Sequence, residues 1–235
     1  MEDRITPGLY MELGNMDPEA YGTLRAPHLL ASPGVQRVTW WENLAPGRDE
    51  LPMEVDDGAV LGVAEVDETF EMPDALHEFT ARRFRRYPRP GQGILSGRPT
   101  TGLLVVWISP QTPELTQALR DWGDFVHIRH IAAAALPGFT RITVYENVDD
   151  IDPRFLHFYE LDCDEPESAY SAMAKLVAQR LGGSRSEEFR HWADYRSAGG
   201  RLIYCNTFSL IGASTNTPGT APSDTTSRSA YEPAS

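Results

Sequence analysis

Two histidines stand at matching places in this sequence and are the residues best suited to proton transfer. His28 and His130 each close a stretch of helical periodicity, and each is followed by a Pro-Gly pair at 33–34 or 137–138. Histidine titrates near neutral pH, so one imidazole can both donate and accept a proton. We therefore predict His28 or His130 as the general acid and base of an active site. The alternative is a histidine that only forms hydrogen bonds within its helix.

Polar and aromatic side chains alternate along the strand that follows each Pro-Gly pair. Arg37 and Trp41 fall on one face of the first strand, and Arg141 and Tyr145 fall on the same face of the second. The apolar residues between them are expected to face the helices, which leaves the arginines and aromatic residues facing the interior. We predict that Arg37 or Arg141 stabilises an enolate-like oxygen and that Trp41 and Tyr145 line the substrate pocket.

Two acidic residues at matching positions add to this predicted site. Glu65 and Glu160 stand on the strand after the one that carries each arginine, and Tyr21 lies on the helix that ends at His28. A charged side chain inside a barrel must be paired or functional, because burying it alone costs several kcal/mol. We predict that Glu65, Glu160 and Tyr21 contact the substrate. The alternative is that each glutamate only pairs with an arginine in a hydrated interior.

These positions match because the chain contains one pattern twice. Residues 32–44 return as residues 136–148, so that Pro137 follows Pro33 by 104 residues. The flanking segments 8–13 and 62–67 also return, as 102–107 and 157–162. An internal repeat of this length indicates two copies of one supersecondary unit, each with a face that the other can cover.

Each copy is predicted to run strand, helix, strand, strand, helix, strand, which is the ferredoxin-like plan. In the first copy, Asp17 caps the first helix, and Pro73-Asp74 opens a second helix that carries Leu76, Phe79 and Phe84. The strands expected there are 9–13, 35–43, 60–66 and 93–96. The strands expected in the second copy are 103–108, 139–146, 155–162 and 201–210, with helices opening at 112 and 166.

Composition divides the chain into two repeats and a tail. Residues 1–98 form the first ferredoxin-like repeat and residues 99–212 the second. Residues 213–235 are almost all Ser, Thr, Pro, Ala, Gly and Asn, which is too little apolar mass to offset the cost of ordering the chain. We predict an α+β protein in which two tandem repeats pack sheet to sheet, followed by a disordered tail.

The charge of the chain disfavours several classes of partner. Thirty-four acidic residues against 21 basic ones give a net charge of −13, which argues against a nucleic-acid surface. The basic run 82–86 is predicted to be a solvated helix face, with anion or acidic-partner binding as the alternative. No stretch of 18 apolar residues appears, so we predict no membrane segment. The two cysteines, Cys163 and Cys205, fit a reducing cytoplasm.

Metal and nucleotide sites are not predicted. The sequence has no HExxH or CxxC spacing and no glycine-rich phosphate loop after a strand. His127 and His130 form a single pair three residues apart, and His127 is predicted to face solvent. We therefore predict no metal and no cofactor, with ligation of heme by one histidine kept as an alternative.

The doubled strand-and-helix plan resembles the dimeric α/β barrel superfamily, with the usual dimer fused into one chain. Within it, a helix ending in His, then small residues, then Pro-Gly and a strand is similar to the EthD family. This resemblance covers about residues 5–212 and implies that the helix-ending histidines lie beside a cleft. The interval from His to Pro is five residues in the first copy and seven in the second, so the two histidines cannot share one geometry.

These observations predict a cofactor-independent enzyme. It would perform a dehydration, isomerisation or cyclisation by proton transfer on a small, largely apolar carbonyl or aromatic compound, a lyase or isomerase type of reaction. The first alternative is a barrel that binds a small molecule or a partner protein without catalysis, and the second is a monooxygenase of the same superfamily. A homodimer is a further possibility that the sequence leaves open.

Overall fold

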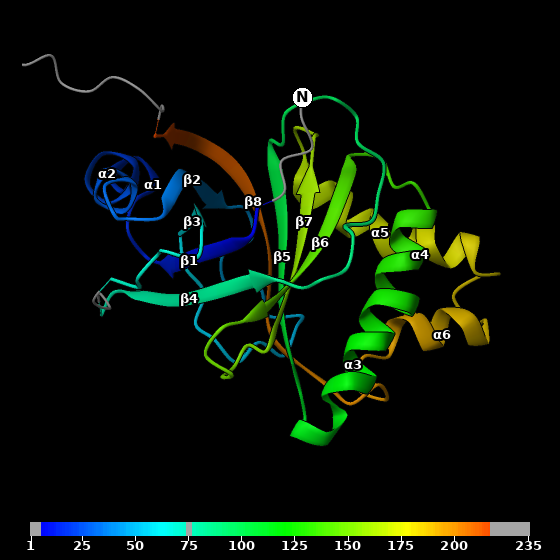
Figure 1. The fold of residues 1–235 in the computed structure, drawn as a ribbon. Helices are drawn as coiled ribbons and strands as arrows, with labels where there is room; N and C mark the ends of the chain where they lie inside the picture. Colours follow the sequence, from blue (N-terminus) through cyan, green and yellow to red (C-terminus); the bar gives the residue numbers. More distant parts are fainter. Residues whose placement is uncertain (1–5, 74–76, 217–235) are drawn as a thin grey trace, which may run out of the picture.

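The computed structural model describes residues 6–73 and 77–216, in which eight strands close into one antiparallel barrel. The strands run around the barrel in the order β1-β3-β2-β8-β5-β7-β6-β4. Their bounds are Gly8–Gly14 (β1), Val35–Asn43 (β2), Val60–Val66 (β3), Phe79–Arg86 (β4), Gly102–Pro110 (β5), Phe139–Asn147 (β6), Phe155–Leu161 (β7) and Gly200–Thr215 (β8). Figure 1 shows these strands between two groups of helices.

The order of the strands shows how the two repeats build the barrel. The first repeat supplies the sheet β4-β1-β3-β2 and the second supplies β8-β5-β7-β6, so both use the same ferredoxin-like order. The last strand of each repeat pairs with the second strand of the other. β2 pairs with β8 from Arg37–Thr215 to Asn43–Phe208, and β4 pairs with β6 over Phe84 to Arg86. The prediction of two tandem ferredoxin-like repeats fused into one barrel is confirmed.

The first helical run of each repeat widens in its middle. The first repeat has α1 (Pro18–Ala20), η1 (Tyr21–Arg25) and α2 (Ala26–Leu30) in one continuous run. The second repeat has η2 (Pro113–Leu115), α3 (Thr116–Trp122), η3 (Gly123–Ile128) and α4 (Arg129–Ala133). The segments η1 and η3 are π-helical and match in position. The Asp17 carboxylate caps the first helix by accepting the Ala20 N–H at 3.0 Å, as predicted.

The two Pro-Gly pairs make the same tight turn. Gly34 has a φ of 79° and Gly138 a φ of 85°, which L side chains rarely adopt. A Cβ on Gly34 would lie 2.5 Å from the Phe70 nitrogen, and a Cβ on Gly138 would lie 2.8 Å from the Cys163 sulfur. Glycine is therefore needed at both turns for the chain to enter the next strand so closely.

The predicted second helix of the first repeat is wrong. Leu76 lies outside the described residues, but Phe79 and Phe84 belong to strand β4, which pairs with β1 on one side and β6 on the other. The predicted fourth strand at 93–96 is also wrong, because β4 occupies that place and only Gln92 bridges to Ile142. The basic run 82–86 is accordingly part of a strand. β1 and β6 each offer an edge with unpaired backbone groups, and pairing with these edges outweighed the helical spacing of the apolar residues.

The predicted start of the disordered tail, at residue 213, is too early. Residues 213–215 are the last residues of β8 and pair with β2, and the Asn216 amide donates to the carbonyl oxygens of Leu30 and Val35 at 2.9 Å each. A strand edge binds any backbone, whatever its side chains, so the polar composition did not prevent pairing. The rest of the predicted tail, 217–235, lies outside the described residues.

Alternation along the strands separates two apolar layers. Trp41, Phe84, Trp107 and Tyr145 belong to the cluster that fills the barrel. On the outer side, Val38 packs with the first helix of repeat one, and Ile142 packs with the helices of repeat two. The second repeat adds α5 (Pro166–Arg180) and α6 (Glu187–Ala193) to this outer layer. No helix among the described residues is long and apolar enough to cross a membrane.

Candidate functional site

The predicted arginines and glutamates pair inside the barrel. Arg37 Nη1 lies 3.2 Å from Glu65 Oε1, and Arg141 Nε lies 2.6 Å from Glu160 Oε2. Each glutamate also accepts a threonine hydroxyl at 3.3 Å, Glu65 from Thr6 and Glu160 from Thr100. The repeat therefore produces the same Thr-Glu-Arg group twice, as the pairing alternative describes. Their predicted roles toward an enolate or a substrate stay predictions.

The two predicted aromatic residues of this set are part of the packed barrel core. Trp41 is buried, and its indole N–H donates to the Thr39 hydroxyl at 2.8 Å. Tyr145 is also buried and packs edge-on against Phe158. Burial raises the pKa of Tyr145 well above its usual value, and the charges of Glu160 and Glu65 raise it further. Arg86 of β4 stands opposite Tyr145 of β6, so the two repeats meet here.

The predicted histidines lie on the other side of the sheet from these arginines. His28 is exposed on α2, and His130 is partly buried on α4. Both helices cover the outer face, whereas Arg37 and Arg141 alternate onto the barrel face. Partial burial, followed by the charges of Arg129, Arg180 and His191, lowers the pKa of His130. The structure thus brings each arginine to a glutamate and neither arginine to a histidine.

The predicted contact residue Tyr21 belongs to a buried polar cluster of the first repeat. Its hydroxyl donates to Glu12 Oε2 at 3.0 Å, and the Tyr10 hydroxyl donates to Glu12 Oε1 at 2.8 Å. Arg25 completes the cluster through Nε and Nη2, and Glu12 is only 1% exposed. Burial, then the charge of Glu12, raises the pKa of Tyr21. Sequence reasoning missed Glu12, although a glutamate inside the apolar stretch 9–13 was the available signal.

His127 is half-buried between two aromatic rings, whereas the sequence predicted that it faces solvent. Its ring stacks between Trp122 and Trp192 at centroid distances of 4.8 and 4.9 Å, and Nδ1 lies 3.1 Å from the Trp192 carbonyl oxygen. A carbonyl only accepts, so Nδ1 carries the hydrogen. Burial lowers the pKa of His127 to about 4 and that of neighbouring His157 to about 3. The two aromatic neighbours of His127 come from separate helices, α3 and α6, so its burial depends on tertiary packing.

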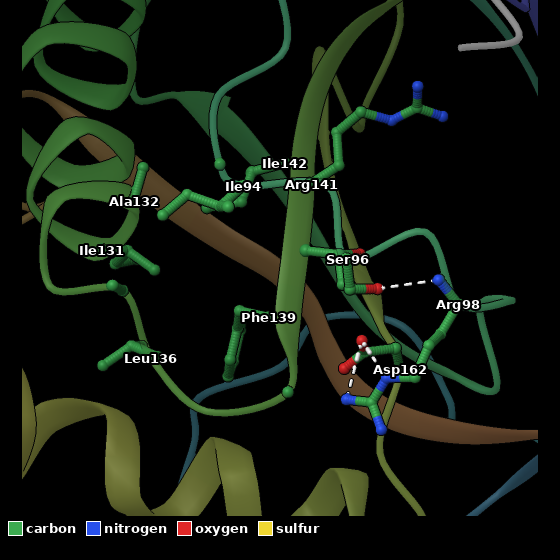
Figure 2. A pocket seen from close by; sticks show the side chains of 14 residues that line it. Ile94, Ser96, Arg98, Ile131, Ala132, Leu136, Phe139, Arg141, Ile142 and Asp162 are labelled. Atoms are coloured by element: carbon green, nitrogen blue, oxygen red, sulfur yellow. Dashed lines mark hydrogen bonds and ion pairs between the residues drawn. The ribbon is translucent and has the colours of Figure 1, made fainter. Parts of the chain in front are cut away.

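The second repeat holds a cavity of about 260 Å³ between α4, the start of β6 and the segment 93–98. Figure 2 shows its apolar wall, to which α4, β6 and the 93–98 segment all contribute. The apolar side chains are Ile94, Ile131, Ala132, Leu136, Phe139 and Ile142. Arg141 borders the cavity, but Figure 2 shows its side chain extending from the opposite side of β6. Neither His28 nor His130 lines this cavity.

Two local features of the chain open this cavity. The turn after α4 is one residue longer than its counterpart after α2, and Ala135 of this turn lies on the cavity wall together with Ala132 of α4. Gly93 lets the 93–98 segment approach β6, because a Cβ there would lie 2.4 Å from the Thr140 carbonyl oxygen. At the matching place in the first repeat, Asn216 ties down the turn instead.

One end of the cavity is polar and contains a buried aspartate. Asp162 follows directly after β7, and its side chain is 3% exposed. Its Oδ2 accepts Arg98 Nε at 3.0 Å and Arg98 Nη2 at 2.9 Å, and the Arg98 backbone N–H donates to the Ser96 hydroxyl at 3.1 Å (Figure 2). Among the described residues, Arg98 is the only side chain that bonds Asp162. No described residue donates a hydrogen bond to Oδ1, and Asp162 lines the cavity.

The matching aspartate of the first repeat is used differently. Asp67 accepts the Thr69 backbone N–H at 2.8 Å and the Thr69 hydroxyl at 2.6 Å, which closes a local turn. Residue 164 matches Thr69 but is an aspartate, which has no hydroxyl to donate. Both aspartates keep the backbone bond of the repeat, from Asp67 N–H to Gly34 and from Asp162 N–H to Gly138. The backbone bond is thus the same in both repeats, but the Asp162 carboxylate does not close a turn and lies at the cavity.

No protein-family model matches the chain, and no curated protein matches it significantly. Solved structures do match over nearly the whole length. An anthrone oxidase-like protein aligns with a TM-score of 0.53 at 16% identity, over 90% of this chain and 94% of its own. A candidate monooxygenase of Fusobacterium nucleatum gives 0.51 at 6% identity, over 89% and 94%. A major regulator of staphylococcal pathogenesis gives 0.51 at 11% identity, over 87% and 99%.

The chain has the dimeric α/β barrel fold. At these identities the similarity shows the fold alone, and the three neighbours differ in what they are described to do. The narrower resemblance to the EthD family stays a prediction. Within the described residues, no group of three or more His, Cys, Asp or Glu side chains could hold a metal ion.

Proposed function

We propose that this chain is an enzyme that binds a small, largely apolar carbonyl compound in the cavity of the second repeat and removes a proton from it with Asp162. The observation that carries the proposal is the contrast between Asp67, which closes a turn, and Asp162, which faces a cavity with an unused oxygen. The apolar walls fit the body of such a compound, and the polar end fits its carbonyl group. The predicted reaction class is kept, while the predicted base changes from histidine to aspartate.

The proposed step needs only side chains at the polar end of the cavity. The C–H bond next to the carbonyl breaks, its proton goes to Asp162 Oδ1, and its electron pair becomes the enolate. The Arg98 guanidinium, beside Oδ2, and the Ser96 hydroxyl are placed to stabilise the enolate oxygen. Return of a proton from Asp162 to the same or another carbon completes an exchange or an isomerisation.

Hydrogen–deuterium exchange tests this proposal without knowledge of the natural substrate. The protein is incubated in D2O with acetophenone, 1-tetralone or hexanophenone, and loss of the α-proton signal is followed by NMR. We expect faster exchange for at least one of these ketones and a loss of about 100-fold or more in D162N. D67N is the matched control and is expected to retain exchange. Exchange that is absent in the native protein, or equal in D162N, overturns the proposal.

Oxidation is the second candidate function. Two of the structural neighbours are described as an anthrone oxidase-like protein and a candidate monooxygenase. A deprotonated carbonyl compound is also a species that O2 can oxidise, so the same base would serve. Consumption of O2 in an oxygen electrode, together with α-exchange, would favour this candidate over an isomerase.

A further inference from the structure

A second cavity, of about 550 Å³, lies beside the first and shares part of its wall. Leu136 and Gly138 line both cavities, and so do Arg98 and Asp162. The second cavity runs along the first turns of α5, where Ala169, Ala172 and Leu176 line it. The Arg98–Asp162 ion pair therefore lies where these two solvent-open clefts, which we call chambers, meet.

The two partners of this ion pair differ greatly in exposure. The Arg98 side chain is 68% exposed, whereas that of Asp162 is 3% exposed. Water competes for an arginine so exposed, but full withdrawal of Arg98 would leave the buried Asp162 carboxylate unpaired, which is strongly destabilising. The Arg98 side chain can therefore pivot aside at low cost only while it keeps one of its two bonds to Asp162 Oδ2. Asp162 directly follows β7, and its backbone N–H donates to the Gly138 carbonyl oxygen at 2.9 Å, which holds its backbone in place.

We propose that Arg98 is a gate between the two chambers and that the ligand is long enough to span both. This inference rests on the proposed function and sets the shape of its substrate. The polar group of the ligand lies part-way along its length, at Asp162. An apolar body fills the first chamber, and an apolar chain passes Arg98 into the second. Arg98 then determines specificity for ligand length.

Two phenyl ketones distinguish binding in the first chamber from binding across both chambers. Acetophenone places a phenyl ring and a carbonyl group in the first chamber only. Hexanophenone has the same ring and carbonyl group, with a five-carbon chain that would enter the second chamber. The affinity of each ketone is measured by calorimetry for the native protein, R98S and R98K. Removing the gate in R98S is expected to raise the preference for hexanophenone over acetophenone by about tenfold. R98K, which keeps a long cationic side chain, is expected to stay near the native ratio.

Arg85 provides a control for removal of an exposed arginine. Its side chain is 64% exposed and pairs at 3.6 Å with the buried Glu146, which Arg120 and Arg154 also bond. Arg85 borders neither chamber. R85S is expected to keep the native ratio of affinities. If R98S also keeps that ratio while both ketones bind, the gate is overturned and the proposed function stands. If neither ketone binds any variant, both are overturned.

A thiol reports occupation of the second chamber directly. Cys163 lines that chamber, whereas Cys205 is buried elsewhere in the core. Labelling with 5,5′-dithiobis(2-nitrobenzoate) therefore reads Cys163 in the folded protein. Saturating hexanophenone is expected to slow the labelling of R98S by about tenfold, and saturating acetophenone by less than about twofold. Equal protection by the two ketones would show that the longer chain does not reach the second chamber.

Discussion

At one pair of matching positions, the outer layers of the two repeats are packed in opposite ways. In the first repeat the large side chain comes from the helix: Tyr21 lies over Gly62, where an added Cβ would be 1.8 Å from the phenol oxygen. In the second repeat the large side chain comes from the strand: His157 lies under Gly123, where an added Cβ would be 3.2 Å from the imidazole. In each repeat this space holds one large side chain and one glycine. The large side chain comes from the helix in the first repeat and from the strand in the second.

The two repeats therefore differ in how their helix–sheet interfaces are closed. The first repeat closes its helix–sheet interface with the fully bonded cluster around Glu12, and Asn216 ties down its turn. The second repeat has a longer turn of small residues and a cavity with Asp162 at one end. We infer that duplication left one copy to hold the barrel together and the other to bind a ligand. Matched changes in the two repeats test this difference.

The largest expected effect is on stability, from Glu12→Ala in the first repeat. Removal of the carboxylate leaves Arg25 without its partner and two tyrosine hydroxyls without an acceptor, which should lower the free energy of unfolding by about 3–5 kcal/mol. Val106 holds the matching position in the second repeat. Val106→Ala is expected to cost about 1 kcal/mol. Urea denaturation measures both, and equal losses would contradict the assignment of the first repeat as the structural one.

The next effect is on catalysis, from Asp162→Asn in the second repeat. Loss of the base should slow α-proton exchange by about 100-fold or more, which corresponds to about 2.7 kcal/mol of transition-state stabilisation. Asp67→Asn changes the matching residue of the first repeat and should leave exchange within about twofold. A comparable loss in both variants would show that the aspartates act through the fold and not as a base.

A smaller effect is expected on the pH dependence of stability. The folded-state pKa values of His127 and His157, about 4 and about 3, lie below the ordinary value near 6.5. The unfolded chain therefore binds more protons in this range, and the free energy of unfolding falls as the pH is lowered below about 6.5. The loss should be about 1.6 kcal/mol per histidine between pH 6.5 and 5. His157→Leu should remove its share of this slope in urea titrations at several pH values, and an unchanged slope would contradict the burial argument.

The smallest effect is expected from the two histidines that the sequence singled out. His28 and His130 lie outside the cavity wall, so H28A and H130A should each change the rate of α-proton exchange by less than about twofold. The same NMR measurement decides this. A loss of 100-fold or more in either variant would restore the histidine as the proton-transfer group and displace Asp162.

The sequence by itself determined the architecture of this protein. The repeat of 32–44 at 136–148 set the strand order of both halves, because equal patterns fold into equal units. Alternation placed Arg37, Glu65 and their counterparts on one face, where they pair as the alternative interpretation described. The five- and seven-residue intervals from His to Pro also marked, in advance, the turn at which the copies diverge.

Only the tertiary structure decided which residues meet. Local pattern favoured a helix through Phe79, but strands β1 and β6 each had an edge to pair, and that non-local need made β4. Arg98 reaches Asp162 across 64 residues of sequence, and the aromatic rings around His127 come from two helices. Such contacts depend on how the copies dock and on the path of the linker. Periodicity and propensity act only between neighbours along the chain, so they could not reveal the cavity or its aspartate.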